Sequence, residues 1–581
     1  MWLLFDDARE GGAAPRLYCQ PVEIIVAHHL HEIERALERI RAGLRARRHA
    51  AGYLAYEAGY AFDPKLEGCA RQGPGPLLCF GLFENFETPD IGKLLPSPDG
   101  AYVGPVRPRI SQAEYEAGVG RVRDHLFAGA YYQANLTFGC DVAVAGDPVA
   151  LYARLRRSSK AGWGGVMIHD GGAIVSLSPE QFFTIRCGII EARPMKGTAP
   201  RRPNPEADLA EAGTLSTDEK QRAENLMIVD LMRNDLARVS VPGSVEVPEL
   251  FSVETYPTVH QMVSRITAQL RIECDAVDMI RTIFPCGSVT GAPKIAAIEA
   301  LTRLEPEPRG AYTGSMGWIE PNHHGEPGDA SFNVLIRTLE WHHGEAKARL
   351  GLGSGLVVDS IPSDEWAECL LKGDFVRREA QEFDLIETMG FDPSEGIIEL
   401  ERHLDRMRNS AADLDFKFDR HAARNELQAA TFGRKQRAMV RLLLSRTGAM
   451  AIQVKRYEDP DEVPVAVAVR PLPVDPSDFR LRYKTTDRRF LDEARQGERA
   501  YETIFTDPEG QLTEGSRTNI FVQRGDKLLT PPLTRGIMPG ILRAKLIEEG
   551  RAEEGDLTPE DLSQGFYIGN IVRGLIPAKL A

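Results

Sequence analysis

The chain has 581 residues, 43% of them hydrophobic, which is too long for one core and predicts two or three domains. A net charge of −14 argues against a nucleic-acid or anionic-membrane surface, so an anionic substrate must meet a local group of Arg and Lys. The eight cysteines form no Cys-x-x-Cys pair, so we expect no disulfide framework. No stretch reaches the about 18 apolar residues of a membrane-spanning helix, and the N-terminal segment lacks the basic start of a signal peptide, so we expect a soluble cytoplasmic protein.

The first predicted element is a helix over residues 31–48, because apolar residues recur there at helical spacing. From residue 111 to 375, helical stretches alternate with short β-branched strands, including 165–168 and 311–319. This pattern favours a mixed α+β sandwich. Residues 197–213 are rich in Pro, Arg and acidic residues without an apolar period, which predicts an exposed loop.

A second pattern begins at Phe383, after a short polar joint. We therefore expect a domain over residues 1–375, a linker over 376–382 and a second domain over 383–581. The proline-rich stretch 464–478 predicts a link between two lobes of that smaller domain. Alternation of Phe479, Leu481 and Tyr483 predicts a strand that points Lys484 to the opposite face.

Three motifs of the first half stand in a fixed order. Glu180 lies in Ser-Pro-Glu-Gln-Phe, Lys196 in Arg-Pro-Met-Lys-Gly-Thr, and Glu224 opens Glu-Asn-Leu-Met-Ile-Val-Asp. A lone lysine is usually a solvated side chain, but these motifs together resemble component I of aminodeoxychorismate synthases, which are chorismate-binding enzymes. Residues 52–60 resemble a strand passage of the same family. The resemblance implies a two-layer α/β sandwich.

The resemblance also implies roles for these residues. Lys196 would attack chorismate at C2 and expel the C4 hydroxyl, which Glu180 would protonate as a general acid with a raised pKa. Ammonia would then add at C4 and release the lysine. Anthranilate synthases have alanine at the position of Lys196, and isochorismate synthases have a water-activating lysine at that of Gln133. The resemblance therefore favours the 4-amino product and ammonia as nucleophile.

Glu365 and Glu368 are three apart on a predicted helix and share a face, where like charges repel unless a cation lies between them. Alone, such a pair is most often a solvated acidic face. The resemblance implies that Glu224 and Glu368 bind Mg2+, with Glu365 close by, and that the metal holds the ring carboxylate.

The segment 284–294 fails the Walker spacing but offers small residues and backbone N–H groups to an anion. In the family it binds the substrate carboxylate. Matching substrate-binding positions are Thr290, Gly291, Tyr312, Arg337, Gly353, Gly355 and Lys372. Gln261 departs from the family, because relatives commonly carry an active-site histidine there, and an amide cannot take up a proton.

The second half resembles fold-type IV pyridoxal 5′-phosphate (PLP) enzymes, most closely aminodeoxychorismate lyases, over nearly its whole length. Lys484 matches the lysine that holds PLP, and Glu514 matches the carboxylate at the pyridinium nitrogen. Positions matching the phosphate contacts are Arg406, the backbone N–H groups of Ile537 and Met538, and Asn570. The domain lacks the first strands of a free-standing lyase. Either residues of the first half complete it, or its activity is weakened.

Together these resemblances imply synthesis of 4-aminobenzoate from chorismate, by amination to 4-amino-4-deoxychorismate and then PLP-dependent elimination of pyruvate, with Mg2+ and PLP as cofactors. No Gly-x-Cys-x-Gly glutaminase motif occurs, so ammonia is expected from a separate class I glutamine amidotransferase subunit. A homo-oligomer is possible. Two alternatives stay open: a synthase whose second half is a non-catalytic PLP-type module, and component I of an anthranilate synthase.

Overall fold

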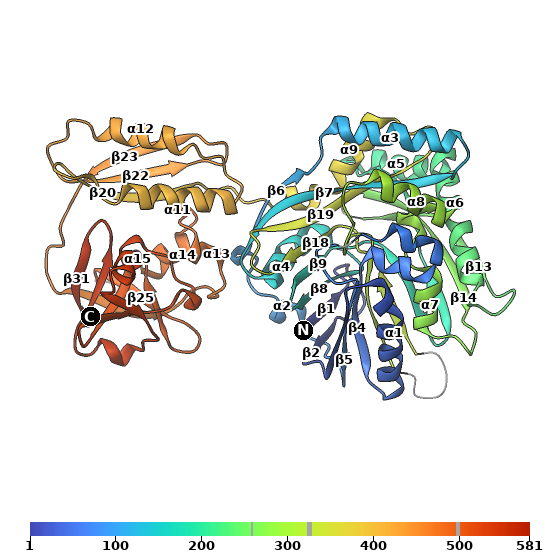
Figure 1. The fold of residues 1–581 in the computed structure, drawn as a ribbon, viewed down its shortest axis with the longest axis horizontal. Helices are drawn as coiled ribbons and strands as arrows, with labels where there is room; N and C mark the ends of the chain where they lie inside the picture. Colours follow the sequence, from blue (N-terminus) through green and yellow to red (C-terminus); the bar gives the residue numbers. More distant parts are fainter. Residues whose placement is uncertain (72, 257–258, 322–327, 496–499) are drawn as a thin grey trace. The chain divides into compact units, whose positions relative to one another are not determined.

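The computed structural model describes residues 1–581 except 72, 257–258, 322–327 and 496–499. Its chain forms two compact units (Figure 1). Unit 1 contains Met1–Leu95, Pro105–Val142 and Tyr152–Glu379; unit 2 contains Pro96–Gly104, Ala143–Leu151 and Ala380–Ala581. Two short segments from the first half of the sequence therefore belong to unit 2.

Unit 1 is built on two large antiparallel sheets. The first has the spatial order β15 (Gly291–Ala292), β7 (Gln133–Ala145), β19 (Lys347–Leu356), β18 (Thr338–His342), β9 (Gly172–Ser176), β8 (Gly164–His169), β1 (Trp2–Asp6) and β2 (Arg16–Cys19), with β6 (Tyr102–Pro108) beside β7. The second has the order β12 (Met195–Pro200), β14 (Val259–Gln269), β11 (Ile189–Ala192), β10 (Gln181–Arg186), β17 (Ala330–Asn333), β16 (Ser315–Ile319), β4 (His49–Leu54), β5 (Leu78–Phe83) and β3 (Glu23–Ala27), with β13 (Glu246–Thr255) beside β14.

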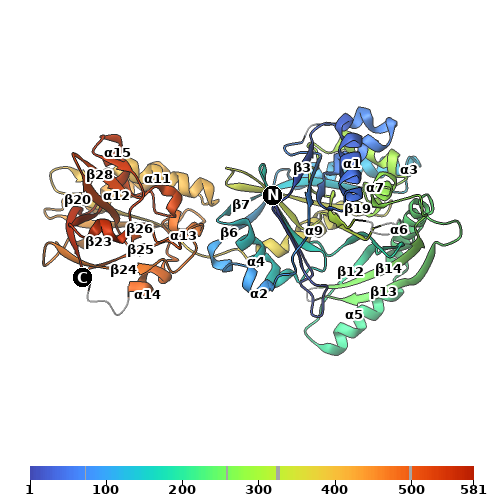
Figure 2. The same ribbon diagram turned by 90° about the horizontal axis from the view of Figure 1, so that it is seen from below.

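One hydrophobic core joins the two sheets. Met167 and Ile174 of the first sheet pack in the same cluster as Tyr53 and Phe332 of the second. Helices also border the sheets: α1 (Leu30–Arg45), α2 (Ile91–Leu94), α3 (Gln112–Phe127), α4 (Pro148–Ser159), α5 (Pro205–Thr217), α6 (Glu219–Ala237), α7 (Ala276–Ile283), α8 (Lys294–Leu304), α9 (Pro362–Lys372) and α10 (Asp374–Arg377). Figure 2 shows β12, β14 and β13 side by side with α5 next to them. The predicted mixed sandwich is confirmed.

The helix predicted over residues 31–48 is also confirmed, with bounds of Leu30–Arg45. Its apolar positions Ile33, Leu37 and Ile40 are buried in the core, as the helical period requires. The strand passage at 52–60 is wrong beyond Leu54, because a 3-10 helix covers Tyr56–Phe62. The strand expected at 311–319 is shorter and begins at Ser315.

The loop predicted over 197–213 is wrong. Residues up to Pro200 belong to β12, and α5 begins at Pro205. The Asn204 side chain accepts hydrogen bonds from the N–H groups of Glu206 and Ala207, and Pro205 occupies the first turn. These proline and acidic residues are signals for a helix start, which their composition alone concealed.

Unit 2 has two sheets. The smaller has the order β21 (Gly396–Ile397), β20 (Leu385–Asp392), β22 (Ala438–Leu444) and β23 (Met450–Arg456). The larger has the order β26 (Leu512–Gly515), β25 (Glu502–Thr506), β24 (Val465–Pro471), β31 (Gly574–Leu580), β30 (Phe566–Asn570), β27 (Asn519–Arg524), β28 (Lys527–Thr530) and β29 (Ala552–Glu554). Its helices are α11 (Leu400–Asp413), α12 (Arg420–Thr431), α13 (Phe479–Arg482), α14 (Arg489–Arg495) and α15 (Ile541–Glu548).

Two predictions for unit 2 need correction. The stretch 464–478 is not only a link, because β24 lies within it and pairs in parallel with β25 and β31. Residues 479–482 form the short helix α13 instead of a strand, with Phe479 and Leu481 both buried. Alternation over three apolar residues was too short to distinguish the two. In the described parts of the chain, no helix is long and apolar enough to cross a membrane.

Candidate active sites

Lys196 lies on β12 at the edge of the second sheet, and its amine reaches β19 of the first. A Cβ atom added to Gly355 would stand 3.1 Å from Lys196 Nζ and 2.7 Å from Gln133 Nε2. Glycine at position 355 thus leaves the space that both side chains occupy. Gln133 is buried, and its Oε1 has no hydrogen-bond partner among the described residues.

The surroundings of the Lys196 amine favour its neutral form. Burial lowers its pKa, and the positive charge of Lys372 lowers it further, while Glu180, Glu224 and Glu368 act in the opposite direction. A neutral amine is the nucleophilic form of lysine. The same carboxylates show that the structure brings together side chains from distant parts of the sequence.

Glu180 is a buried carboxyl just before β10. Burial raises its pKa, although a hydrogen bond from Ser288 Oγ to Oε1, at 2.7 Å, partly opposes this. A carboxyl group of this kind can carry a proton near neutral pH. Sequence reasoning missed Ser288, whose only signal was its place in the small-residue segment 284–294.

Three carboxylates project from α6 and α9. Burial raises the pKa of Glu224, and repulsion from Glu365 and Glu368 adds to this. Burial would raise the pKa of Glu368 too, but Lys372, whose Nζ lies 2.8 Å away, lowers it. In the described part of the chain, no three His, Cys, Asp or Glu side chains already lie close enough to hold a metal ion. The negative charges of Glu365 and Glu368 do act on Glu224, from the other helix.

The predicted substrate-binding residues lie on several elements of unit 1. Lys372 ends α9 and donates to the Gly353 carbonyl at 2.8 Å, so helix and glycine-rich strand are tied together. The ring of Tyr312 lies against Gly351, where a Cβ atom would stand 2.1 Å from it. Thr290 and Gly291 lie beside β7. Burial lowers the pKa of Arg337, which makes no ion pair with the described residues.

A buried ion pair connects the elements that carry several of these predicted substrate-binding residues. Sequence reasoning missed it. Arg309 pairs with Glu305 at 2.8 Å and donates to the carbonyl groups of Asn135 and Val289. Glu305 also accepts from Thr137, on β7. Arg309 therefore joins the strand of Gln133, the loop of Thr290 and the segment before Tyr312.

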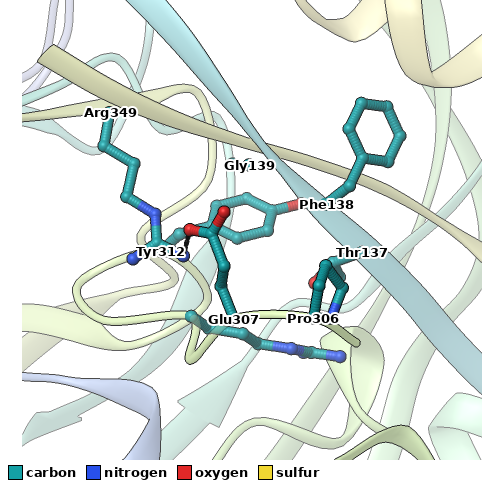
Figure 3. Close-up of a pocket in the computed structure, with 9 residues that line it drawn as sticks. Thr137, Phe138, Gly139, Pro306, Glu307, Tyr312 and Arg349 are labelled. Carbon is teal, nitrogen blue, oxygen red and sulfur yellow. Dashed lines mark ion pairs between the residues drawn. The ribbon is translucent and has the colours of Figure 1, made fainter. Parts of the chain in front are cut away.

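Figure 3 shows a small pocket beside this network, lined by Arg309, Tyr312 and Gly351 among others. An ion pair between Arg349 and Glu307, at 3.3 Å, crosses it. Its volume of about 10 Å³ holds one water molecule. The pocket is lined by neither Lys196 nor Glu180, so it is separate from the predicted catalytic residues.

Gln261 holds the backbone next to Lys196. Its Nε2 donates to the Gly197 carbonyl at 2.9 Å, and its Oε1 accepts from Thr198 Oγ1 at 3.0 Å. The neighbouring His260 is engaged elsewhere, with Asp208 at 3.0 Å. The amide at position 261 is thus a structural contact of the lysine strand.

In unit 2, Lys484 follows α13, and its carbonyl accepts from the N–H of Ile386 on β20 at 2.8 Å. Burial, with the charge of Arg406, lowers the pKa of Lys484 to about 7. Burial raises the pKa of Glu514 to about 8, which a backbone hydrogen bond from Met538 and the charge of Arg488 partly oppose. The structure thus puts a lysine and a carboxyl with strongly shifted pKa values into one site.

The predicted phosphate contacts already have partners within the protein. Arg406 makes two hydrogen bonds of 2.7 Å to Glu387, which also binds His403 at 2.6 Å. Against the effect of burial, the charge of Arg406 and the hydrogen bonds from Arg406 and His403 keep the pKa of Glu387 well below its usual range. Asn570 accepts from the N–H groups of Val572 and Arg573 and so shapes a turn. Ile537 and Met538 precede α15, as predicted.

Comparison with known proteins gives matches for both halves. Residues 8–378 match the family of chorismate binding enzymes, and residues 384–581 match class IV amino-transferases. The chain is 42% identical to aminodeoxychorismate synthase component 1 of Klebsiella aerogenes over 262 residues. This aligned segment covers 45% of this chain and 56% of that protein. It thus spans little more than half the length of this relative.

Anthranilate synthases are similar too. The chain is 34% identical over 373 residues to anthranilate synthase component 1 of Methanothermobacter thermautotrophicus, covering 60% of this chain and 76% of that protein. The crystal structure of anthranilate synthase component I from Streptococcus pneumoniae TIGR4 matches with a TM-score of 0.53 at 24% identity, covering 62% of this chain and 92% of that one. This last likeness shows the fold.

Proposed function

Because the chain belongs to the chorismate-binding enzyme family through residues 8–378, we propose that it makes 4-aminobenzoate from chorismate in two steps. The first takes place in a synthase domain over residues 1–375, and the second in a lyase domain over 383–581. The observation that carries the proposal is the buried amine of Lys196, which lies among Glu180, Glu224, Glu368 and Lys372.

In the first step, the neutral amine of Lys196 attacks C2 of chorismate, both ring double bonds shift, from C1=C2 to C1=C6 and from C5=C6 to C4=C5, and the C4 hydroxyl leaves. Glu180 donates the proton that turns this group into water. Ammonia then attacks C4, both double bonds shift back, and the bond to Lys196 breaks. The product is 4-amino-4-deoxychorismate. The lowered pKa of Lys196 and the raised pKa of Glu180 support these roles.

Glu224 and Glu368 would hold Mg2+, with Glu365 close by. Hard carboxylate oxygens suit this ion, and the repulsion that Glu365 and Glu368 exert on Glu224 supports a cation there. The metal would supply positive charge for the ring carboxylate of chorismate. Thr290, Gly291, Tyr312, Arg337, Gly353, Gly355 and Lys372 would line the rest of the substrate site.

The match to class IV amino-transferases supports PLP as the cofactor of unit 2. When bound, PLP supplies an electron sink for the bonds at C4 of the substrate. Lys484, with a pKa of about 7, takes the C4 proton. The C3–O bond then breaks, pyruvate leaves and the ring becomes aromatic. Glu514 would face the pyridine nitrogen, and Arg406, Ile537, Met538 and Asn570 would hold the phosphate.

Ammonia would come from a separate class I glutamine amidotransferase. The name of the Klebsiella aerogenes relative, component 1, supports a second component. The purified chain should therefore use ammonia but not glutamine, and addition of such a partner should restore the use of glutamine. Glutamine-dependent turnover by the chain alone would contradict this.

The central experiment incubates the purified chain with chorismate, Mg2+, ammonia and PLP and identifies the products by chromatography. We expect 4-aminobenzoate and pyruvate in equal amounts. Lys196→Ala should make neither, whereas Lys65→Ala, at an exposed position, should match the unchanged protein. Lys484→Ala should accumulate 4-amino-4-deoxychorismate.

Two other results would overturn parts of the proposal. Formation of 2-aminobenzoate would favour an anthranilate synthase, which the 76% coverage of the Methanothermobacter relative keeps as the second candidate. Accumulation of 4-amino-4-deoxychorismate by the unchanged chain would show that unit 2 is a non-catalytic module.

A further inference from the structure

Three arginines surround Lys484 in unit 2, and the protein neutralises only one of them. Arg406 is paired with Glu387 through two hydrogen bonds. Arg488 donates to the carbonyl of Ser516, at 2.8 Å, which carries no charge. Arg441 makes no ion pair or hydrogen bond through its guanidinium with any described residue, and its Nε is buried without a partner. Arg441 and Arg488 therefore make no ion pair with a carboxylate of the described residues.

The position of Arg441 is fixed by the register of the smaller sheet. Its neighbours Val440 and Leu442 are fully buried in the core of unit 2, so Arg441 points to the opposite face. It stands across from Thr388 on β20, two positions from the pair of Ile386 and Leu443. Ile386 is the residue whose N–H binds the Lys484 carbonyl. Arg441 thus rises beside the segment that carries Lys484 and Arg488.

The nearby acids form no ion pair with these two arginines, although the negative charges of Asp492 and Glu502 act on Arg488. The raised pKa of Glu514, about 8, leaves it mostly uncharged at neutral pH. Glu502 is held by Ser516 Oγ at 2.5 Å and Thr518 Oγ1 at 3.0 Å. Both Arg441 and Arg488 act on Lys484 through their positive charge. A partly buried cation without a partner is unfavourable unless an anion joins it.

We propose that Arg441 and Arg488 bind the carboxylates of the lyase substrate and select a small ring compound that carries two of them. The proposal rests on the proposed function, whose second substrate has one carboxylate on the ring and one on the enolpyruvyl group. A guanidinium presents paired N–H donors in the geometry of a carboxylate. Two such groups beside Lys484 distinguish a dicarboxylate from a monocarboxylate by charge and by hydrogen bonding.

The test uses the full chain loaded with PLP and follows the absorbance of the cofactor, which reports on unit 2 and not on the synthase site. The probes are isophthalate, with two carboxylates meta to each other on a ring, and benzoate, with one. The unchanged protein should bind isophthalate about tenfold or more tightly than benzoate, the effect of one added charged hydrogen-bonded contact. Arg441→Gln and Arg488→Gln should each remove most of this preference.

Two controls separate the site from general charge and folding. Lys455→Gln removes a positive charge from an exposed position of the same sheet and should keep the preference. Arg441→Lys keeps the positive charge but loses the paired N–H donors of the guanidinium, so it should retain part of the preference that Arg441→Gln loses. Retained cofactor absorbance shows that each variant is folded.

Several results would overturn the proposal. One is an unchanged preference for isophthalate in both glutamine variants. Another is a preference below about twofold, or no absorbance response at all, in the unchanged protein. A third is loss of PLP itself from the variants, which would assign the arginines to cofactor binding. Failure of the proposed function looks different. A chain that prefers isophthalate through these arginines but releases no pyruvate from 4-amino-4-deoxychorismate has the anion site without the activity.

Discussion

At the scale of single residues, the structure combines an acid, Glu180, whose pKa is raised, with a base, Lys196, whose pKa is lowered. Glu180 must be protonated to act and Lys196 must be neutral, so activity should fall at both high and low pH. Ser288 lowers the pKa of Glu180, because its hydroxyl donates a hydrogen bond to the carboxylate and stabilises the charged form. Burial and this hydroxyl group therefore act in opposite directions on the alkaline side of the profile.

Ser288→Ala should move the alkaline side of the synthase pH–rate profile to higher pH. Loss of the hydrogen bond to the charged carboxylate raises the pKa of Glu180, so the acid keeps its proton further into the alkaline range. Ser288→Thr keeps a hydroxyl and should stay near the unchanged profile. A move to lower pH in the alanine variant would contradict this role.

Lys484 should give the capture of PLP a distinctive pH dependence. The neutral amine is the reactive form, and the pKa of this lysine is lowered to about 7. The rate at which the cofactor-free chain takes up PLP should rise as pH increases through about 7 and then level off. Stopped-flow absorbance measures this rate. A rate that still climbs above pH 9 would indicate a lysine with an ordinary pKa near 10.4.

At the scale of elements, helices α6 and α9 supply the carboxylates proposed for the metal. Glu368→Gln and Glu224→Gln should each lower the synthase rate by at least about a hundredfold and remove its dependence on Mg2+, because an incomplete oxygen shell holds a hard cation poorly. Glu219→Gln, at an exposed position of α6, is the matched control. Normal synthase rates of the unchanged chain in excess EDTA would rule out the metal site.

The buried ion pair of Arg309 and Glu305 connects several elements beside the proposed synthase site. Arg309→Ala should lower the free energy of unfolding of unit 1 by about 3–5 kcal/mol, because it leaves Glu305 as an uncompensated buried charge. Arg39→Ala breaks an exposed pair with Glu23 and should cost about 1 kcal/mol or less. Urea unfolding followed by circular dichroism compares them. Equal losses would contradict a supporting role for Arg309.

At the scale of the whole molecule, unit 2 includes residues from the first half of the sequence. Tyr102, Ala143 and Ala145 belong to the same hydrophobic core as Phe383 and Phe479. The hydroxyl of Tyr102 donates to the Leu414 carbonyl at 2.6 Å. These residues supply apolar surface to unit 2.

Tyr102→Ala should therefore destabilise unit 2 by about 3–5 kcal/mol, the cost of a large cavity in a core. Release of PLP absorbance during urea unfolding reports on this unit. Tyr132→Ala, at a position that is 70% exposed, should leave the transition unchanged. A stable unit 2 in the Tyr102 variant would show that its core does not need the first half.

The sequence by itself determined the two families, the mixed α/β sandwich, helix α1 and the shared face of Glu365 and Glu368 on α9. These follow from local motifs and from the period of apolar residues, which short segments carry. It was misleading at α5, where the polar composition concealed the capping signal of Asn204 and Pro205. It was misleading at α13 too, because alternation over three residues is too short to distinguish a strand from a helix.

Only the tertiary structure decided which groups share a site and in which charge state. The pKa of Lys196 depends on its burial and on Lys372, which is far away in the sequence. The partners of Arg309 and the isolation of Arg441 depend likewise on strands that meet only in the folded chain. Burial and long-range pairing are properties of the packed molecule, so the sequence names these residues but does not reveal what they face.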